Sequence, residues 1–233
     1  MNVLPFEILF EDAHILVCLK PSGTATQGRN IARQDMVSYL KNYIGKTGPD
    51  SGGGKEPYLA VVHRLDQPVR GIMVFAKTPF AARELSRELG EAGFEKHYRA
   101  LVTGKPPERT GIVENYLVKD ARANFSRICP KGTAGAKHAR LSYQIVEEEP
   151  YLFGGTVPDS CAGECTEVDI RLYTGRHHQI RVQMAGIGCP IAGDAKYNPK
   201  AQHSERRQDL KLCSCSLTFT HPKTKETMRF SLL

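Results

Sequence analysis

The sequence contains no tryptophan, and aromatic residues make up only 8% of its 233 residues. This composition does not suggest an extended platform on which single-stranded nucleic acid would stack. No apolar run approaches the roughly 20 residues that cross a bilayer, and the N-terminus lacks the basic and apolar regions of a signal peptide. We therefore expect a cytoplasmic protein that does not contact the membrane.

Paired cysteine ligands are also missing, although seven cysteines are present. Three residues separate Cys161 from Cys165 and one separates Cys213 from Cys215, whereas zinc sites usually have a gap of two. The number of cysteines is odd, and several lie in apolar, strand-like segments. We expect reduced, mostly buried thiols and no metal site.

The remaining composition is that of a globular protein, with 40% hydrophobic and 24% charged residues. Lysine and arginine total 32 against 25 acidic residues, which gives a net charge of +7. A basic balance suits a polyanionic partner, because phosphate contacts by cations release counterions. Many basic proteins bind no nucleic acid, so charge alone leaves the partner open.

Hydrophobic patterns predict one α+β domain over residues 1–233, dominated by a mixed or antiparallel sheet with few helices. Thr78-Pro79 is a strong helix start, since it combines a hydroxyl cap with proline in the first turn. Gly52-Gly53-Gly54 lacks the Lys-Ser/Thr that follows in a phosphate-binding loop, which favours a surface loop. Strands are expected at 6–10, 14–19, 72–76, 96–102, 111–117, 137–147, 166–172, 210–220 and 227–233, and helices at 35–44, 78–90 and 176–187.

Residues 60–71 form the first segment in which chemistry concentrates. A strand leads into a compact loop that carries Asp66, with His63, Arg64 and Arg70 around it. Catalytic groups often lie on such loops, held by a rigid scaffold. A surface cluster of salt bridges at the end of a strand would give the same pattern, so the residues alone leave both interpretations open.

Residues 173–184 form the second such segment. Arg176, His177, His178 and Arg181 gather near the start of an expected helix, where free N–H groups favour an anion. Such a cluster can bind phosphate or a partly buried carboxylate. A di-histidine metal site is the competing interpretation, although adjacent histidines on a helix point in different directions. An RNA-binding surface without catalysis also fits.

Motifs at four places along the chain resemble those of the RluA-type pseudouridine synthases, and they occur in the same order as in that family. They are Ile8-Leu9-Phe10-Glu11-Asp12 with Lys20-Pro21-Ser22-Gly23; His63-Arg64-Leu65-Asp66-x-x-x-x-Gly71; Lys96-x-Tyr98-x-Ala100-x-Val102-x-Gly104; and Thr174-Gly175-Arg176-x-His178-Gln179-Ile180-Arg181-Val182 with Gly188-x-Pro190-Ile191-x-Gly193-Asp194-x-x-Tyr197. Together they cover roughly residues 7 to 230. A single match could arise by chance, whereas several in register are highly specific.

This resemblance implies a single catalytic domain built on a long mixed, mostly antiparallel sheet, with flanking helices and loops around a central cleft. It implies that uridine is isomerised to pseudouridine in structured ribosomal or transfer RNA. The reaction involves no redox change, so the resemblance implies no organic cofactor and no metal. Because the chain begins almost at the first motif, we expect no separate N-terminal RNA-binding domain, and we expect a monomer.

The resemblance also implies roles for individual residues. Asp66 matches the catalytic aspartate, Arg181 the arginine that pairs with it, and Tyr98 the tyrosine that stacks on the flipped uracil. An arginine beside a partly buried carboxylate favours its ionised form. Arg64 resembles an arginine that fills the gap left by the base. We expect the remaining site residues to bind RNA or to support the site: His63, Arg70, Arg176 and His178.

Some positions depart from the family pattern. Val69-Arg70 replaces the usual Thr-Ser, His177 stands where threonine is usual, and Gln183 where histidine is common. A non-catalytic RNA-binding relative therefore remains the alternative, and a metal-dependent hydrolase is a third hypothesis. Residues 200–207 are either a further RNA contact or a solvated loop.

Overall fold

The computed structural model describes residues 5–28, 34–47, 56–89, 93–148, 151–153, 165–202 and 209–233. In these residues eleven strands form a sheet in the order β1-β2-β4-β10-β5-β9-β8-β6-β7, with β3 beside β4 and β11 beside β10. Every strand pair whose register is described is antiparallel. This arrangement confirms the predicted α+β fold with a long, mostly antiparallel sheet and flanking helices.

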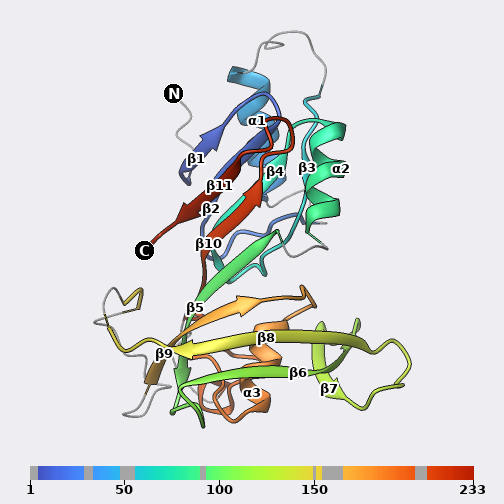
Figure 1. The fold of residues 1–233 in the computed structure, drawn as a ribbon. Helices are drawn as coiled ribbons and strands as arrows, with labels where there is room; N and C mark the ends of the chain where they lie inside the picture. Colours follow the sequence, from blue (N-terminus) through green and yellow to red (C-terminus); the bar gives the residue numbers. More distant parts are fainter. Residues whose placement is uncertain are drawn as a thin grey trace. The chain divides into compact units, whose positions relative to one another are not determined.

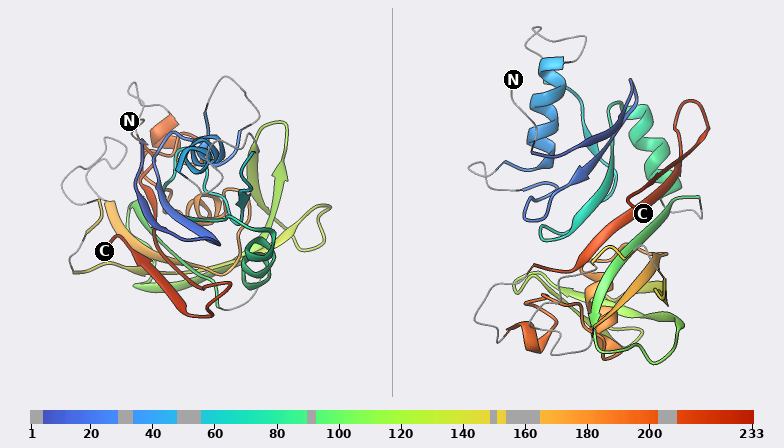
Figure 2. Two further views of the ribbon diagram at one scale, coloured as in Figure 1. Left: turned by 90° about the horizontal axis from the view of Figure 1, so that it is seen from above. Right: turned by 90° about the vertical axis from the view of Figure 1, so that its left-hand side faces the viewer.

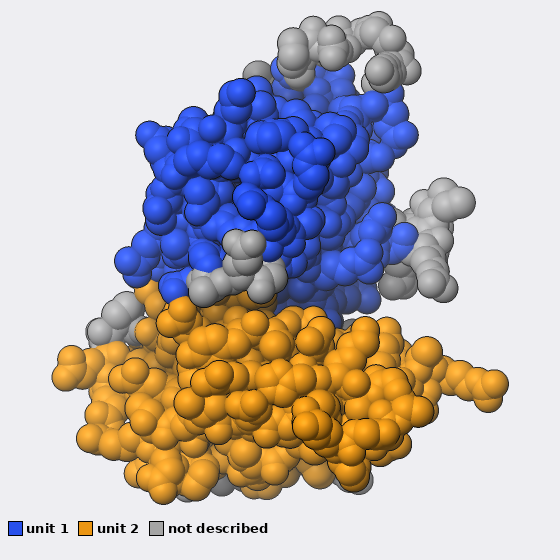
Figure 3. Space-filling model, turned by 45° about the vertical axis from the view of Figure 1, so that its right-hand side comes forward, with its two compact units in different colours: residues 1–95, 214–232 blue, residues 96–213, 233 orange. Residues whose placement is uncertain are grey.

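The chain divides into two compact units (Figure 3). Unit 1 comprises Met1–Glu95 and Ser214–Leu232, and unit 2 comprises Lys96–Cys213 with Leu233. Cys161, Gly52-Gly53-Gly54 and residues 203–207 lie outside the described residues.

Unit 1 packs helices and a sheet around an apolar core. Its elements are β1 (Ile8–Glu11), β2 (Ile15–Lys20), α1 (Met36–Thr47), β3 (Ala60–Val61), β4 (Arg70–Ala76), α2 (Pro79–Glu88), most of β10 (Leu212–Thr220), and β11 (Thr227–Ser231) (Figures 1 and 2). Helix α2 begins where Thr78 and Pro79 predict it, and the Thr78 hydroxyl accepts the Ala81 N–H at 3.1 Å. The core includes fully buried Val17, Val74 and Phe219.

Two ends of the chain meet in unit 1. The buried His221, just after β10, bonds through its Nε2 to the Asp12 carboxylate at 2.9 Å, although the two residues are 209 positions apart in the sequence. Strands β2 and β4 pair from Ile15 with Ala76 to Lys20 with Gly71. Gly71 has a φ of 140°, and a Cβ there would lie 2.4 Å from the Ser214 carbonyl oxygen, so only glycine fits.

Unit 2 places one helix against a five-stranded part of the sheet. Its elements are β5 (Glu95–Thr103), β6 (Thr110–Asp120), β7 (Phe125–Cys129), β8 (Lys137–Ile145), β9 (Cys165–Leu172), α3 (Gln179–Gly186) and α4 (Pro199–Gln202). Figure 1 shows α3 behind β6 and β8, and Val182 of α3 packs with Leu117 and Ala139. Helix α3 is shorter than the predicted 176–187, because His178 adopts a left-handed conformation with φ 55° and precedes the first helical residue.

The cysteines largely follow the prediction of buried, reduced thiols. Cys18, Cys129, Cys189, Cys213 and Cys215 carry reduced thiols and are buried, and burial raises the pKa of the Cys18 thiol to about 12. Cys165, at the first position of β9, is disulfide-bonded instead, which corrects the prediction at this residue. Cys165 is only partly buried, whereas the five reduced cysteines are buried.

Neither a membrane helix nor a metal cluster is found in the part of the chain that the structure describes. None of the described helices has the length and apolar character needed to cross a bilayer. Across the same residues, His, Cys, Asp and Glu side chains nowhere gather in threes as metal ligands would.

Candidate active site

Asp66 lies in the loop that joins β3 to β4 in unit 1, and its side chain is partly exposed. The apolar residues on either side, Leu65 and Val69, are buried, with exposed fractions of 5% and 2%. The Val69 N–H donates to the Asp66 carbonyl oxygen at 3.0 Å, which closes a tight turn. The loop is thus anchored on both sides of the carboxylate.

The opening motif of the chain holds this loop in place. Six hydrogen bonds join the segment 20–26 to residues on both sides of Asp66: Lys20 Nζ to Gln67 O (3.1 Å), Gly23 N to Gln67 O (2.9 Å), Gln67 Nε2 to Gly23 O (2.9 Å), Ser22 Oγ to Pro68 O (2.9 Å), Thr26 Oγ1 to Leu65 O (2.9 Å) and Leu65 N to Thr26 Oγ1 (3.2 Å). Two motifs that are far apart in sequence therefore form one rigid structure, as a preorganised carboxylate requires.

Lys20 is the centre of this structure and was not among the predicted site residues. Its side chain is fully buried, and besides Gln67 its Nζ donates to the carbonyl oxygens of Pro21 (2.9 Å) and Thr24 (2.6 Å). Burial lowers the pKa of Lys20 to about 8, and the negative charge of Asp66 acts in the opposite direction. Asp66 is thus close enough to favour the charged form of this lysine.

The buried lysine predicts a pH-dependent stability. The unfolded chain holds the Lys20 proton up to its ordinary pKa of 10.5, whereas the folded chain releases it at about 8. Between these values the unfolded state binds more protons, so the free energy of unfolding rises with pH. Relative to Lys20→Met, the wild type should gain about 2 kcal/mol between about pH 7.5 and about pH 9.5, measured by urea unfolding. If the free energies of unfolding of the wild type and Lys20→Met differed by the same amount at every pH, the lowered pKa of Lys20 would be contradicted.

The other residues near Asp66 differ in exposure. Arg64 is exposed and its Nη2 donates to the Gln27 side-chain oxygen at 3.1 Å, and Arg70 is exposed at the start of β4. His63 is buried, and its Nε2 accepts the Val74 N–H at 3.2 Å. Arg64 and Arg70 are therefore placed to meet a ligand from solvent, while the contact of His63 favours a structural role.

Unit 2 holds the remaining site residues. Tyr98 lies on β5 opposite Ile170 of β9, and only 5% of its surface is exposed. Arg181 lies on α3 and is paired with Asp194. Its Nε donates to one oxygen of the Asp194 carboxylate at 2.8 Å, and its Nη2 donates to the other at 2.7 Å. Both side chains are buried, with exposed fractions of 6% and 0%. Such a two-pronged pair fixes the plane of the guanidinium group.

Tyr197 joins several parts of this region. Its hydroxyl oxygen accepts the Ser126 N–H at 2.8 Å and lies 2.8 Å from His178 Nδ1, while its ring lies 5.2 Å from the Arg181 guanidinium carbon. Since the backbone group must donate, the tyrosine proton is directed to His178. Burial lowers the pKa of His178 to about 2, and the positive charge of Arg181 adds to this, so the imidazole is neutral and accepts.

Removing the Tyr197 hydroxyl should destabilise the fold. Tyr197→Phe would leave the Ser126 N–H and His178 Nδ1 without this partner inside a buried region, at an expected cost of about 1–3 kcal/mol. Thermal or urea unfolding measures the loss. Tyr173→Phe is the matched control, because Tyr173 is 45% exposed and its hydroxyl lies 3.3 Å from Ser142 Oγ. Equal effects of the two variants would exclude the role assigned to Tyr197.

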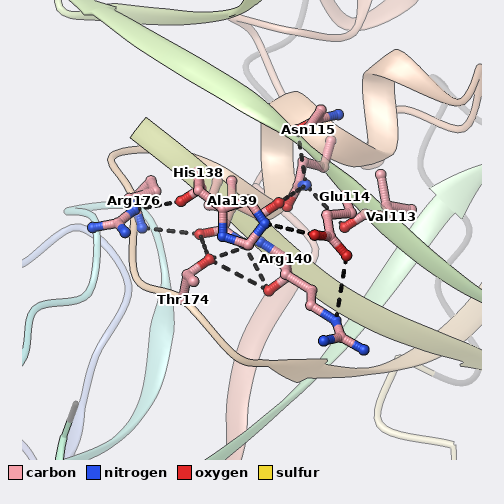
Figure 4. A network of polar contacts seen from close by, with 10 residues as sticks. Val113, Glu114, Asn115, His138, Ala139, Arg140, Thr174 and Arg176 are labelled. Atoms are coloured by element: carbon pink, nitrogen blue, oxygen red, sulfur yellow. Dashed lines mark hydrogen bonds and ion pairs between the residues drawn. The ribbon is translucent and has the colours of Figure 1, made fainter. Parts of the chain in front are cut away.

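The C-terminal motif is also bonded to strand β8 (Figure 4). Arg176 Nε donates to the His138 carbonyl oxygen at 2.7 Å, and Thr174 Oγ1 accepts the Arg140 N–H at 2.8 Å. From α3, Gln183 Nε2 donates to the carbonyl oxygens of Val113 (3.1 Å) and Ala139 (3.3 Å) and to Asn115 Oδ1 (3.0 Å). These bonds fix α3 and the residues just before it, and with them Arg181, against the sheet.

The predicted site residues thus fall into two groups. Unit 1 brings Asp66, Arg64, Arg70 and His63 together with Lys20, and unit 2 brings Arg176, His178 and Arg181 together, with Tyr98 on a neighbouring strand. Three supporting residues lie within the quoted motifs but were given no role from the sequence: Lys20, Asp194 and Tyr197. Their positions within those motifs are the signal from which the sequence could have indicated a supporting role.

A family model described as RNA pseudouridylate synthase matches residues 14–186. The chain belongs to this family. The match spans Asp66, Tyr98 and Arg181 and confirms the resemblance to RluA-type enzymes.

Relatives with curated names support the same family. "Ribosomal large subunit pseudouridine synthase C" of Salmonella typhimurium strain LT2 is 35% identical over 228 residues, and so is the protein of that name from Escherichia coli K12. The protein of that name from Vibrio vulnificus is 31% identical over 230 residues. These alignments cover 95% or 96% of this chain and 64% of each relative, so the chain spans less than two thirds of their length.

Solved structures of pseudouridylate synthase domains share the fold. The human "RNA Pseudouridylate Synthase Domain Containing 4" aligns with a TM-score of 0.74 at 19% identity, covering 97% of this chain and 87% of that one. The human "RNA Pseudouridylate Synthase Domain Containing 1" aligns with a TM-score of 0.73 at 20% identity, covering 100% and 85%.

Proposed function

We propose that this chain isomerises uridine to pseudouridine in ribosomal RNA, with Asp66 as its catalytic carboxylate. The observation that carries the proposal is the family match over residues 14–186, a range that includes Asp66, Tyr98 and Arg181. The resemblance of the surrounding motifs supports giving these three residues the family's catalytic roles. The names of the relatives favour ribosomal over transfer RNA. The rigid loop around Asp66, built on a buried lysine, is the kind of support that a reacting carboxylate needs.

In the proposed reaction, Asp66 attacks or deprotonates the ribosyl-uracil unit. The bond between N1 of the base and the sugar breaks, the uracil turns, and its C5 bonds to the same sugar carbon. The C5 proton is released to water, and N1 takes up a proton from water. Product and substrate are isomers, so no redox partner or external group is needed. Tyr98 stacks on the displaced base, and Arg181, whose guanidinium group is held by Asp194, is the cation that we propose for the reaction at Asp66.

The RNA contacts that we propose come from Arg64, Arg70 and Arg176. His63 and His178 are buried and hydrogen-bonded, which supports structural roles for them. We further propose that the two units belong to one catalytic domain, and that the chain works as a cytoplasmic monomer.

The test is release of tritium from RNA. An unmodified transcript of large-subunit ribosomal RNA, labelled with tritium at C5 of uridine, is incubated with the purified chain and then digested. We expect tritium in water and an equal amount of pseudouridine in the digest, with no change when a chelator is added. Binding without tritium release would favour the non-catalytic RNA-binding relative, and loss of activity with the chelator would favour a metal-dependent enzyme.

A further inference from the structure

The hairpin of β6 and β7 and the loop that follows it carry a concentration of positive charge. We call residues 119–137 the basic arm; it forms the edge of the unit 2 sheet, with β7 as the terminal strand (Figure 1). Its cations are all exposed: Lys119, Arg122, Arg127, Lys131 and Lys137. Asp120 is the single acidic residue of the arm. The arm therefore carries +4 of the chain's net +7, since five cations stand against one carboxylate.

These cations lack acidic partners in the residues that the structure describes, and no ion pair involves any of the five. The Asp120 carboxylate is engaged in the turn, where it accepts the N–H groups of Arg122 (2.9 Å) and Ala123 (3.0 Å). Surface cations elsewhere do find partners, as the exposed Lys225 does with Glu84. Clustered, unpaired charge of one sign is unfavourable for folding and suits the binding of a polyanion.

The arm is fixed to the start of α3. His177 lies 2.8 Å from Ser126 Oγ through Nδ1 and 3.0 Å from Asn124 Oδ1 through Nε2. Lys196 Nζ donates to the Asn124 carbonyl oxygen at 2.7 Å. The charges of Lys119 and Lys196 both lower the pKa of His178, so positive charge continues from the arm to the helix that carries Arg181.

The arm offers cations without an exposed aromatic ring. Phe125, its one aromatic residue, stacks on Tyr197 at 4.5 Å between ring centroids. Binding of a single strand usually uses aromatic rings on which bases stack, whereas a helical stem is bound through its backbone. The five residues of β7 extend about 17 Å, enough for roughly five phosphates along one strand of a duplex.

We propose that the basic arm is a docking surface for the phosphate backbone of a double-stranded RNA stem. The inference deepens the proposed function and rests on it, since it assigns to the arm the helical part of the same substrate RNA. The stem would lie along β7, and the fixed arm would hold it in a constant position relative to α3.

The test compares two triple variants with equal charge changes. Arg122→Gln/Arg127→Gln/Lys131→Gln removes three cations from the arm, and Arg83→Gln/Lys223→Gln/Arg229→Gln removes three exposed cations from unit 1. Binding to a fluorescein-labelled RNA hairpin with a stem of about 16 base pairs is measured by anisotropy at several salt concentrations. The arm variant should bind at least about tenfold more weakly, and the slope of log K against log salt should fall by about 2 to 3.

The control variant should stay within about twofold of the wild type, because it keeps all five cations of the arm and salt screens the exposed charges that it removes. If both variants bound the hairpin equally more weakly than the wild type, net charge alone would explain RNA binding and the proposal would be overturned. Unchanged binding of the arm variant, or an effect seen only with oligouridine or with phosphatidylglycerol vesicles, would also overturn it.

Turnover separates this proposal from the proposed function. If the wild type binds the stem through the arm but forms no pseudouridine, the docking surface stands and the enzymatic proposal fails. If the wild type is active and the arm variant has the same kcat/KM on the ribosomal transcript, the enzymatic proposal stands and the docking surface is excluded.

Discussion

Asp66→Asn is expected to reduce pseudouridine formation by about four orders of magnitude or more while leaving RNA binding nearly unchanged. The amide has the shape of the carboxylate but carries no negative charge and is neither a good nucleophile nor a base. The loop should keep its form, because its hydrogen bonds to Lys20–Thr26 use backbone atoms and other side chains around Asp66. Single-turnover tritium release and anisotropy measure the two quantities separately.

Glu56→Gln provides the matched control for this variant. Glu56 is an exposed carboxylate of the same unit, paired with Lys41 at 2.7 Å, so its removal changes the charge equally without touching the loop. The control should retain wild-type activity. If Asp66→Asn kept more than about a tenth of the activity, a role for Asp66 in covalent or acid–base catalysis would be excluded.

Asp194→Leu is expected to lower the free energy of unfolding by about 3–5 kcal/mol. It removes the partner of the buried Arg181 guanidinium and leaves its charge in a region of low polarity. Urea unfolding measures the loss. A change below about 1 kcal/mol would mean that Arg181 finds another anion or reaches solvent when Asp194 is removed.

A double variant separates the structural role of Arg181 from the proposed catalytic one. Replacing both partners, as in Arg181→Met with Asp194→Leu, removes the uncompensated charge and should recover much of the lost stability. The double variant should nevertheless be inactive, because it lacks the cation that we propose for the reaction at Asp66. An active and stable double variant would show that Arg181 serves only to hold α3 in place.

Local patterns predicted the elements that depend on local chemistry. The cap of α2 at Thr78 and most strands lie where the residues indicated. Strand β7 was missed, since Phe125–Cys129 is short and its exposed Arg127 and Ile128 break the alternation of buried and exposed positions. The end of α3 was predicted well, but its start was not, because a left-handed residue such as His178 leaves no mark in a hydrophobic pattern.

The motifs predicted which residues matter but not how they are supported. Lys20 is held by backbone carbonyl oxygens, which every residue carries, so its partners could not be read from side-chain types. Arg181 and Asp194 are 13 residues apart, with a turn of unpredicted path between them. The acidic partner of a buried arginine is therefore decided by tertiary structure, which the spacing alone does not contain.

The meeting of residues 209 positions apart at Asp12 and His221 has a consequence for biosynthesis. Unit 1 is assembled from both ends of the sequence, so during translation its first 95 residues wait for the strands that follow Cys213. At about 5–20 residues per second, synthesis of the intervening segment takes roughly 6–24 s. Throughout this interval the edge of β4 that will face Ser214 is uncovered in the nascent chain, which makes it a natural place for a chaperone to bind.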